Sequence, residues 1–433
     1  MRSQVRGRWR IAGRSRILSA SSLEPLGHTM HVLFLSRWIP YPATNGSKLR
    51  IYNLLRVLAP RHEVTLLSFA DRPDADYTAP ALRALCRDIH VVPWTPFDPR
   101  SGHALRGLLS GTPRSLVDTF SPMMARRIET TLAEGRTSLV VASQIGTASY
   151  AQYFHDTPAL FEEVELGVLY DRFKRAPTAG QRARYGLTWL KHRRYLYRLL
   201  PHFRACTVVS ETERRLLATA VPNAPRIEVI PNAVDGAPGA SVTARRDPNG
   251  LIFAGSLTYV ANHDAMRWFL ADVFPHICRE WPTAHLTVTG DPGDAALEPT
   301  PGVTLTGLLD DVRGAVASAS VSVVPIRIGG GTRLKILESM ALGTPVVATS
   351  KGAEGLDVVS GEHLLIADDP RQFADHVVRL LHDRALREGL AGRARELVVQ
   401  RYDWAVVGPR FAALVENVGR PAGPVPTPYE GGG

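Results

Sequence analysis

The feature that most constrains the fold is a strand, a glycine turn, a helix and a second strand in direct succession between Val321 and Ala348. Val321 to Val324 is a short valine-rich run that stops at Pro325, as a buried parallel strand does. Three consecutive glycines, Gly329 to Gly331, follow, and a second apolar run occupies Val346 to Ala348. Parallel strands need a crossover connection that is usually a helix, so this order predicts a parallel α/β sheet.

The start of the predicted helix carries the groups that an anion needs. The three glycines lack a Cβ, so a ligand can approach their backbone closely. We expect Thr332 at the helix N-cap, where unpaired backbone N–H groups point out of the first turn. Arg333 and Lys335 add positive charge to that terminus, which favours a phosphate group.

A carboxylate follows one turn later on the same helix face. Glu338 lies three residues after Lys335, and its oxygens can accept hydrogen bonds from sugar hydroxyls. Phosphate cradle and carboxylate together predict a nucleotide-sugar site. The alternative is an ordinary glycine turn followed by a solvated Lys–Glu pair. The turn is not a Walker loop, because no Gly-Lys-Ser/Thr closes it, and it lacks the alternating glycines of the dinucleotide fingerprint.

At these residues the chain resembles the family 4 glycosyltransferases, also called group 1 glycosyl transferases. Many members carry two glutamates separated by seven residues, the second in a Leu-Glu-Ala-Met-Ala-x-Gly-x-Pro-Val-Val context. Glu338 matches the second glutamate, in Leu-Glu-Ser-Met-Ala-Leu-Gly-Thr-Pro-Val-Val, whereas the first falls on Gly330 and is missing. Further similarity covers Val32–Arg50, Arg226–Asp235 and Leu251–Leu257. The opening segment also resembles the branch associated with exosortase and exopolysaccharide systems.

The resemblance implies the GT-B fold, in which two facing Rossmann-like, doubly wound α/β domains enclose a cleft. It implies that Arg333 and Lys335 stabilise the departing diphosphate and that Glu338 holds the ribose, so these three are the candidate catalytic residues. The implied donor-binding set is Gly255, Ser256, Gly329, Gly330, Gly331 and Thr332. Where the family often has a Lys-Gly pair, this chain has Tyr259-Val-Ala-Asn262, so one expected cation is absent.

On the opposite domain we expect the acceptor side at Gly46, whose backbone can approach the reacting centre, and at Arg50. The family implies retention of anomeric configuration, and no residue is named as a general base. We expect no metal and no cofactor besides the donor substrate. Asp74 and Asp76 have the spacing of a metal-binding pair but lie in a polar loop with proline, and the histidines show no metal spacing.

Alternating strands and helices predict two α/β domains. The family resemblance implies which domain binds the donor and that the terminal helix crosses back to the first domain, so we expect five parts of the chain. These are a disordered basic extension at 1–29, an acceptor-side Rossmann-like domain at 30–236, a nucleotide-sugar-binding Rossmann-like domain at 237–403, a terminal helix crossing back at 404–418, and a disordered tail at 419–433. The predicted strands of the first sheet are His31–Ser36, Val64–Ser68, Ile89–Val92, Leu139–Ala142 and Ala205–Val209, with a helix at Asn45–Leu58. Those of the second are Leu251–Ala254, Leu286–Thr289, Val303–Thr306, Val321–Val324, Val346–Ala348 and Leu364–Ile366. We expect the linker between the domains at Ala237–Gly250.

Composition indicates a two-domain enzyme without a membrane span. A chain of 433 residues can build two cores, and its 45% hydrophobic content includes no long apolar run. Cys86, Cys206 and Cys278 form no paired spacing, which predicts reduced core residues in a cytoplasmic protein. Residues 1–29 hold six arginines against one acid, and Met30 directly precedes the first strand. We favour a disordered extension, with a misassigned start at Met1, over a targeting segment.

A segment from 172 to 204 contains no Asp or Glu but many cations and aromatic residues. Such a helix can lie on the anionic inner face of the plasma membrane or meet a lipid-linked acceptor. The alternative is an amphipathic helix with its aromatics in the core and its cations in water. Nucleic-acid binding is disfavoured, because no recognition module accompanies the charge.

The sequence therefore predicts a metal-independent, hexosyltransferase-type glycosyltransferase of cell-surface polysaccharide or glycoconjugate synthesis. Its donor would be a nucleotide sugar, and its acceptor a glycan or a lipid-linked molecule. Two alternatives stay open. One is a GT-B sugar-nucleotide epimerase, and the other is a catalytically degenerate nucleotide-sugar-binding scaffold, suggested by Gly330 and by the absent Lys-Gly pair.

Overall fold

The computed structural model describes residues 29–70, 77–236, 244–293, 297–309, 311–330 and 333–420. Several predictions lie outside these ranges. They concern the arginine-rich segment up to residue 28, Asp74 and Asp76, the first half of the predicted linker, Gly331 and Thr332, and the tail beyond residue 420.

The first domain is built on a seven-stranded sheet in the order β3-β2-β1-β4-β5-β6-β7, in which all neighbours run parallel. Its strands are β1 (His31–Ser36), β2 (Glu63–Ala70), β3 (Asp88–Pro93), β4 (Leu139–Ser143), β5 (Ala159–Glu162), β6 (Ala205–Val208) and β7 (Arg226–Val229). Every residue of β1 is buried, as expected for a strand covered on both faces.

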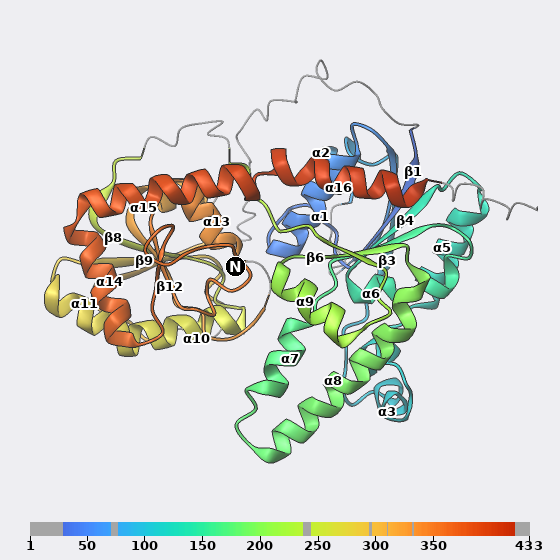
Figure 1. The fold of residues 1–433 in the computed structure, drawn as a ribbon, viewed down its shortest axis with the longest axis horizontal. Coiled ribbons are helices and arrows are strands. Elements are labelled where there is room, and N and C mark those ends of the chain that lie inside the picture. The colour runs from blue at the N-terminus through green and yellow to red at the C-terminus, as the bar shows by residue number, and fades with distance from the viewer. Residues whose placement is uncertain are drawn as a thin grey trace, which may run out of the picture.

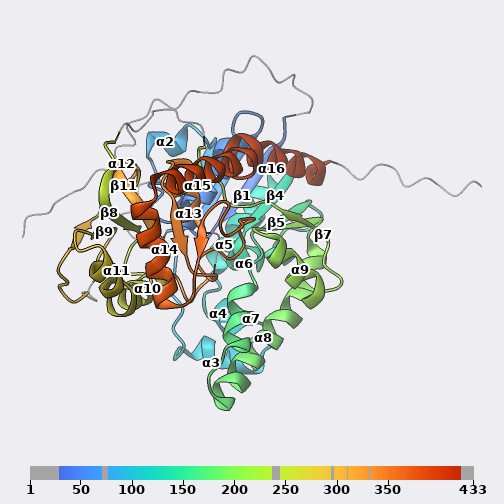
Figure 2. The same cartoon turned by 60° about the vertical axis from the view of Figure 1, so that its left-hand side comes forward.

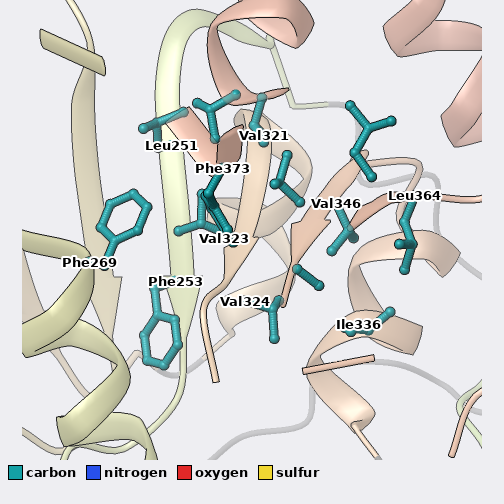
Figure 3. Close-up of a cluster of buried hydrophobic side chains, with 14 of the residues drawn as sticks. Leu251, Phe253, Phe269, Val321, Val323, Val324, Ile336, Val346, Leu364 and Phe373 are labelled. Carbon is teal, nitrogen blue, oxygen red and sulfur yellow. The ribbon is translucent and has the colours of Figure 1, made fainter. Parts of the chain in front are cut away.

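The second domain contains a six-stranded parallel sheet in the order β10-β9-β8-β11-β12-β13. Its strands are β8 (Asp247–Ala254), β9 (His285–Thr289), β10 (Val303–Gly307), β11 (Ala319–Val324), β12 (Val346–Ala348) and β13 (Leu365–Ile366). Figure 3 shows how Phe253, Val321 and Val346 from three adjacent strands pack with Phe269 and Phe373 from the covering helices. Burying one such side chain contributes about 1.5–3 kcal/mol.

Helices cover both sheets (Figure 1). Those of the first domain are α1 (Gly46–Leu58), α2 (Pro80–Arg83), α3 (Gly102–Leu109), α4 (Arg114–Asp118), α5 (Pro122–Ala133), α6 (Gln144–Ala148), α7 (Gly167–Lys174), α8 (Ala179–Leu199) and α9 (Glu211–Ala220). Those of the second part are α10 (Val260–Trp268), α11 (Phe274–Glu280), α12 (Val312–Ser318), α13 (Leu334–Ala341), α14 (Pro370–His382), α15 (Arg384–Leu397) and α16 (Trp404–Gly419). The two parallel α/β domains facing each other confirm the predicted fold class.

The last helix, α16, packs on the first domain. Figures 1 and 2 show it running from the second domain across to α1. Its apolar face, including Val407, Phe411 and Val415, is buried in a core of the first domain. Where the chain returns, the backbone of Val234 donates to the Tyr402 carbonyl at 2.8 Å and accepts from the Trp404 N–H at 3.2 Å. The two crossings between the domains are therefore paired side by side.

Most predicted elements are confirmed, with three differences. Strand β1 and helix α1 lie where the pattern places them, and the Asn45 side chain caps α1 by accepting from the Lys48 N–H at 2.9 Å. Strands β5 and β7 were not predicted. The linker was predicted to extend to Gly250, but β8 already begins at Asp247, because its first residues pair with β9 and β11.

The cysteines are unpaired. Cys86 and Cys206 are buried and Cys278 is half-buried. Burial raises the pKa of the Cys86 and Cys206 thiols to about 12, so both stay protonated at neutral pH.

Candidate active site

The predicted glycine turn follows β11 at the carboxyl edge of the second sheet. Gly329 has a positive φ of 93°, and a Cβ there would lie 2.9 Å from the Tyr259 hydroxyl. Helix α13 begins at Leu334, with Arg333 in the N-cap position. The prediction that the helix starts behind an N-cap at Thr332 is therefore displaced by one residue. The reason is that Arg333 has a non-helical backbone, with ψ at 69°, while its side chain turns back toward the glycines.

Arg333 holds this turn in place. Its guanidinium is only 7% exposed and donates to the carbonyls of Gly330 at 3.0 Å and Gly329 at 3.2 Å. It also donates to the Lys351 carbonyl at 3.0 Å. Burial lowers the pKa of Arg333, although an arginine remains charged at neutral pH. The structure therefore gives Arg333 a positioning role in the turn, and does not expose the guanidinium for the direct leaving-group contact that was predicted.

Lys335 is the cation that reaches the turn after β8. Its ammonium donates to the Asn262 Oδ1 at 2.7 Å and lies 4.1 Å from the centroid of the Phe253 ring. A Cβ at Gly255 would come within 2.8 Å of both the Lys335 Nζ and the Asn262 Nδ2, so glycine is needed for this approach. Burial, followed by the charge of Arg333, lowers the pKa of Lys335 to about 7. Lys335 therefore changes charge near neutral pH.

Glu338 presents an unengaged carboxylate. It lies one turn after Lys335 on α13, and its carboxylate oxygens make no hydrogen bond or ion pair with any residue that the structure describes. Lys335 bonds to Asn262, so the solvated Lys335–Glu338 pair considered as an alternative does not form. Burial raises the pKa of Glu338 to about 7, with the Lys335 charge opposing the rise. This side chain is free to accept ligand hydroxyls.

The turn after β8 is a hydrogen-bonded loop. Ser256 Oγ lies 2.6 Å from Thr258 Oγ1 and donates to the Asp291 carbonyl at 3.2 Å. The Ser256 carbonyl accepts from the Asn262 Nδ2 at 2.7 Å, which ties the loop to α10 and to Lys335. In the sequence, Asn262 was noted only because it lies where the family often has a lysine. No local sequence pattern predicts its hydrogen bond to Lys335.

Of the two predicted acceptor-side residues, the structure places one at the cleft. Gly46 begins α1, and a Cβ there would lie 3.3 Å from the Leu334 Cδ1 at the start of α13, so the two domains meet at these helix starts. Arg50 is 1% exposed and donates to Glu162 at 2.7 Å, Asn232 at 2.9 Å and the Ile230 carbonyl at 3.0 Å. These bonds leave no surface for an acceptor. Arg50 instead ties β5 to the segment that leads into the second domain, which corrects the predicted role.

Sequence reasoning missed a polar pair at the carboxyl edge of the first sheet. Gln144, after β4, and Glu163, after β5, have positive φ values of 67° and 61°, which non-glycine residues seldom adopt. Gln144 Nε2 donates to the Glu163 carboxylate at 2.9 Å and to the Ser47 Oγ at 3.3 Å. Burial, followed by the Glu162 charge, raises the pKa of Glu163 to about 7. Glu163 was missed because β5 was not recognised, whereas Gln144 directly follows the recognised β4 and has no local sequence signal of its own.

A pocket of about 180 Å³ opens between the domains beside the glycine turn. It is lined by Asp171 and Glu213 of the first domain and by Gly330, Lys351 and Glu354 of the second. The Lys351 ammonium forms ion pairs with both Asp171 and Glu354, which links the domains at the rim. In the described part of the chain, no group of three or more His, Cys, Asp or Glu side chains is arranged to hold a metal ion.

Two family models match the chain. Residues 44–237 match "Glycosyltransferase Family 4", and residues 248–383 match "Glycosyl transferases group 1". The chain is 32% identical over 158 residues to a phosphatidyl-myo-inositol mannosyltransferase of Mycobacterium leprae, covering 34% of this chain and 42% of the relative. It is 30% identical over 202 residues to the enzyme of that name from Mycolicibacterium smegmatis, covering 44% and 51%. The match thus spans about half the length of these curated relatives or less.

Solved structures share the fold. A sucrose-phosphate synthase from Thermosynechococcus elongatus superimposes with a TM-score of 0.67 at 16% identity, covering 90% of this chain and 99% of that one. HepE from Anabaena, solved in complex with UDP-glucose, gives a TM-score of 0.60 at 15% identity, covering 90% and 100%. Together the two family models take in about three quarters of the chain, and both domains are included. The chain therefore belongs to the group 1, or family 4, glycosyltransferases and has their GT-B fold.

Proposed function

We propose that the protein transfers a sugar from a nucleoside-diphosphate sugar to a glycan or lipid-linked acceptor, with retention of anomeric configuration, in cell-surface polysaccharide or glycoconjugate synthesis. The observation that carries this proposal is the placement of Lys335 and Glu338 on one face of α13, directly behind the glycine turn and opposite the first domain. The relatives named mannosyltransferases and the neighbour that binds UDP-glucose support it.

Glycosyl transfer from a nucleoside-diphosphate sugar requires positive charge beside the leaving group. In the transfer, the bond between the anomeric carbon and the diphosphate oxygen breaks, and a bond from the acceptor oxygen to that carbon forms. Negative charge develops on the departing diphosphate, where a protonated Lys335 and the backbone N–H groups of the turn stabilise it. The acceptor proton passes to the departing phosphate. In this proposal Lys335 and the turn supply the positive charge that the leaving group needs, and the donor is the sole co-substrate.

The remaining residues bind and position. Glu338 accepts hydrogen bonds from the ribose hydroxyls, and Arg333 keeps the turn in its ligand-ready shape. Gly46 lets α1 approach α13, so the two domains can close over the donor and exclude water that would hydrolyse it. Gln144 and Glu163, which are bonded to each other and through Gln144 to Ser47 at the start of α1, are our candidates for holding the acceptor hydroxyl.

A thermal-shift screen of the full chain tests the donor site. The ligands are UDP, GDP, ADP and dTDP, each beside one of its sugar esters. We expect the ligands of one nucleotide base to raise the melting temperature of the protein. This shift should be lost in Lys335→Ala and kept in Lys174→Ala, which removes an exposed lysine of α7. Absence of any shift in a folded protein would contradict the proposal. Product analysis then separates the alternatives, because an epimerase converts the donor without an acceptor and a scaffold turns nothing over.

We further propose that α3 and α8 dock on an anionic membrane surface. These helices project from the first domain together and are joined by the bond from Lys191 to the Gly107 carbonyl (Figure 1). Of the aromatic residues that the alternative placed in the core, Trp189 and Tyr195 are half-buried and pack against the core of the first domain, whereas Tyr197 is exposed. The Trp189 ring centroid lies 5.2 Å from that of Tyr170. The exposed apolar side chains are Leu105, Leu108, Leu109, Leu187 and Leu190, and the exposed cations of α8 are Arg182, Arg184, Arg193, Arg194 and Arg198.

Apolar side chains flanked by cations suit the interface of an anionic bilayer. No helix in the described part of the chain combines the length and apolarity needed to span a membrane. Co-sedimentation with phosphatidylcholine vesicles, with and without phosphatidylglycerol, tests the surface. We expect binding only with the anionic lipid, reduced in Leu109→Ser (95% exposed) and unchanged in Leu308→Ser (61% exposed, second domain). Equal absence from both pellets would refute it.

A further inference from the structure

A carboxylate of the first domain lies against the glycine turn of the second. Glu165 follows β5 in the segment that leads to α7. Its Oε1 lies 2.8 Å from the position that a Cβ would take at Gly330, and the Val168 Cγ2 lies 2.1 Å from the same position. Position 330 therefore has room only for a hydrogen, because the first domain already fills the space that a side chain there would occupy.

The backbone around Glu165 is held on both sides. On one side, the Glu163 N–H donates to the Thr207 Oγ1 at 2.9 Å. On the other, the N–H groups of Leu166 and Gly167 donate to the Glu213 carboxylate at 3.1 Å and 2.9 Å. The segment is anchored from two elements of the first sheet and its covering helices, so the Glu165 side chain is presented to the cleft from a fixed backbone.

The Glu165 carboxylate itself is unengaged. The residue is exposed in the cleft and makes no hydrogen bond or ion pair with any residue in the described ranges. Protein crowding around the carboxyl raises its pKa, and the nearby positive charge of Arg333 opposes that rise. An anchored and unpaired carboxylate facing a ligand turn is placed to accept hydrogen bonds from a ligand.

Charge decides which part of a ligand fits there. A carboxylate repels a diphosphate, and the ammonium of Lys335 and the glycine turn already provide for that group. The neutral, hydroxyl-rich part of a nucleotide sugar is its sugar, whose hydroxyls can donate to carboxylate oxygens. Resting on the proposed function, we infer that Glu165 binds the hydroxyls of the donor sugar from across the cleft, supplying a carboxylate where Gly330 provides none.

The inference has a structural consequence. Lys335 and Glu338 belong to the second domain, whereas Glu165 belongs to the first, so a nucleoside diphosphate needs one domain and its sugar needs both. Sugar recognition and domain closure are then a single event, and the rim ion pair between Lys351 and Asp171 lies on the same side of the cleft as this contact.

The test compares dissociation constants for a nucleoside diphosphate and for its sugar ester, by titration calorimetry on the full chain. The probes are UDP with UDP-glucose, GDP with GDP-mannose, ADP with ADP-glucose and dTDP with dTDP-glucose. In Glu165→Ala, we expect the sugar ester to lose about tenfold in affinity, as for a lost hydrogen bond to a charged group, while the nucleoside diphosphate changes by less than about twofold. Glu165→Gln should lose less than Glu165→Ala, because an amide oxygen still accepts.

Glu129→Ala, which removes an exposed carboxylate from α5 in the same domain, is the matched control and should leave both constants unchanged. An unchanged ratio of the two constants in Glu165→Ala would overturn the inference and leave the proposed function standing. Equal loss for the nucleoside diphosphate and its ester would overturn it as well. Binding of none of the eight probes by the wild-type chain would overturn both this inference and the proposed function.

Discussion

The protonation of Lys335 should set the pH range in which the protein binds a nucleoside diphosphate tightly. Burial and the Arg333 charge hold the pKa of the ammonium at about 7 in the free protein. A bound diphosphate adds negative charge beside the ammonium and favours its protonated form, so the pKa rises on binding. The complex therefore holds a proton that the free protein lacks above neutral pH.

The magnitude follows from this difference. Below about pH 7 the free protein is already protonated, and the Lys335 contribution to binding is fully present. At about pH 8 roughly one free molecule in ten retains the proton, so binding must take one up. We expect the affinity to fall about tenfold per pH unit from about pH 7 until the pKa of the bound state is reached.

Two matched variants isolate this effect. Lys335→Met removes the titrating group but keeps the volume in contact with Phe253, so the ratio of wild-type to variant affinity cancels the titration of the ligand's own phosphate. Glu338, with a pKa raised to about 7, titrates in the same range and favours binding when it is ionised. The ratio should therefore be measured again in a Glu338→Gln background, where only Lys335 changes charge.

The assay is titration calorimetry with the nucleoside diphosphate selected by the thermal-shift screen, between about pH 6 and about pH 9. Proton uptake measured in buffers of different ionisation enthalpy should approach about one proton per site above pH 8 in the wild type and should be lower in Lys335→Met. A ratio of affinities that stays constant across this range, or that rises with pH, would refute a phosphate-binding role for a neutralisable Lys335.

Three further substitutions test the packing around the site. Gly330→Ala places a Cβ 2.1 Å from Val168, so sugar-ester affinity should fall about fivefold or more, whereas Gly314→Ala on α12, with open space around it, should bind as the wild type does. Arg50→Met leaves the Glu162 carboxylate buried without its cationic partner and should lower the free energy of unfolding, measured with urea, by about 3–5 kcal/mol. Adding Glu162→Gln should recover part of this loss, and a loss under about 1 kcal/mol would contradict the buried pair. Gly408→Val brings a Cβ within 2.9 Å of a valine of α1 and should lower the free energy of unfolding by about 1–3 kcal/mol, and an unchanged urea midpoint would argue against the packing of α16 on the first domain.

Strands that are buried along their whole length could be predicted from the local sequence pattern alone. Strand β1 was placed to the residue and the helix that follows it to within one residue, because every side chain of β1 is buried and Asn45 caps the start of α1. Strand β5 was missed because it has only four residues and ends in Glu162, a buried carboxylate whose partners, Arg50 and Ser143, are distant in the sequence. Strand β7 alternates charged and apolar residues at the sheet edge, and its four residues are too few to show a strand pattern by themselves.

The candidate site divides in the same way. The glycine turn, Lys335 and Glu338 are contiguous in the chain, so their spacing alone predicted a shared helix face. The partner of Lys335 is 73 residues away at Asn262, and the carboxylate beside Gly330 comes from the other domain. Such contacts depend on how two separately folded sheets meet, which no local pattern encodes. Arg50 was misassigned for the opposite reason. Its place near the predicted cleft suggested that it binds a ligand, whereas its partners in the structure are the buried side chains of Glu162 and Asn232.

The placement of α16 has a consequence for synthesis of the protein. Val407, Phe411, Val415 and Val418 complete a core to which β1, β2, β4 and α1 also contribute. The Arg204 guanidinium also donates to the Val418 carbonyl at 2.9 Å. On the ribosome, the N-terminal half emerges long before these residues, so one apolar face of its sheet stays uncovered until α16 has been synthesised. The second domain carries all its strands in one continuous stretch, and it can therefore finish folding before the first domain, although it is made later.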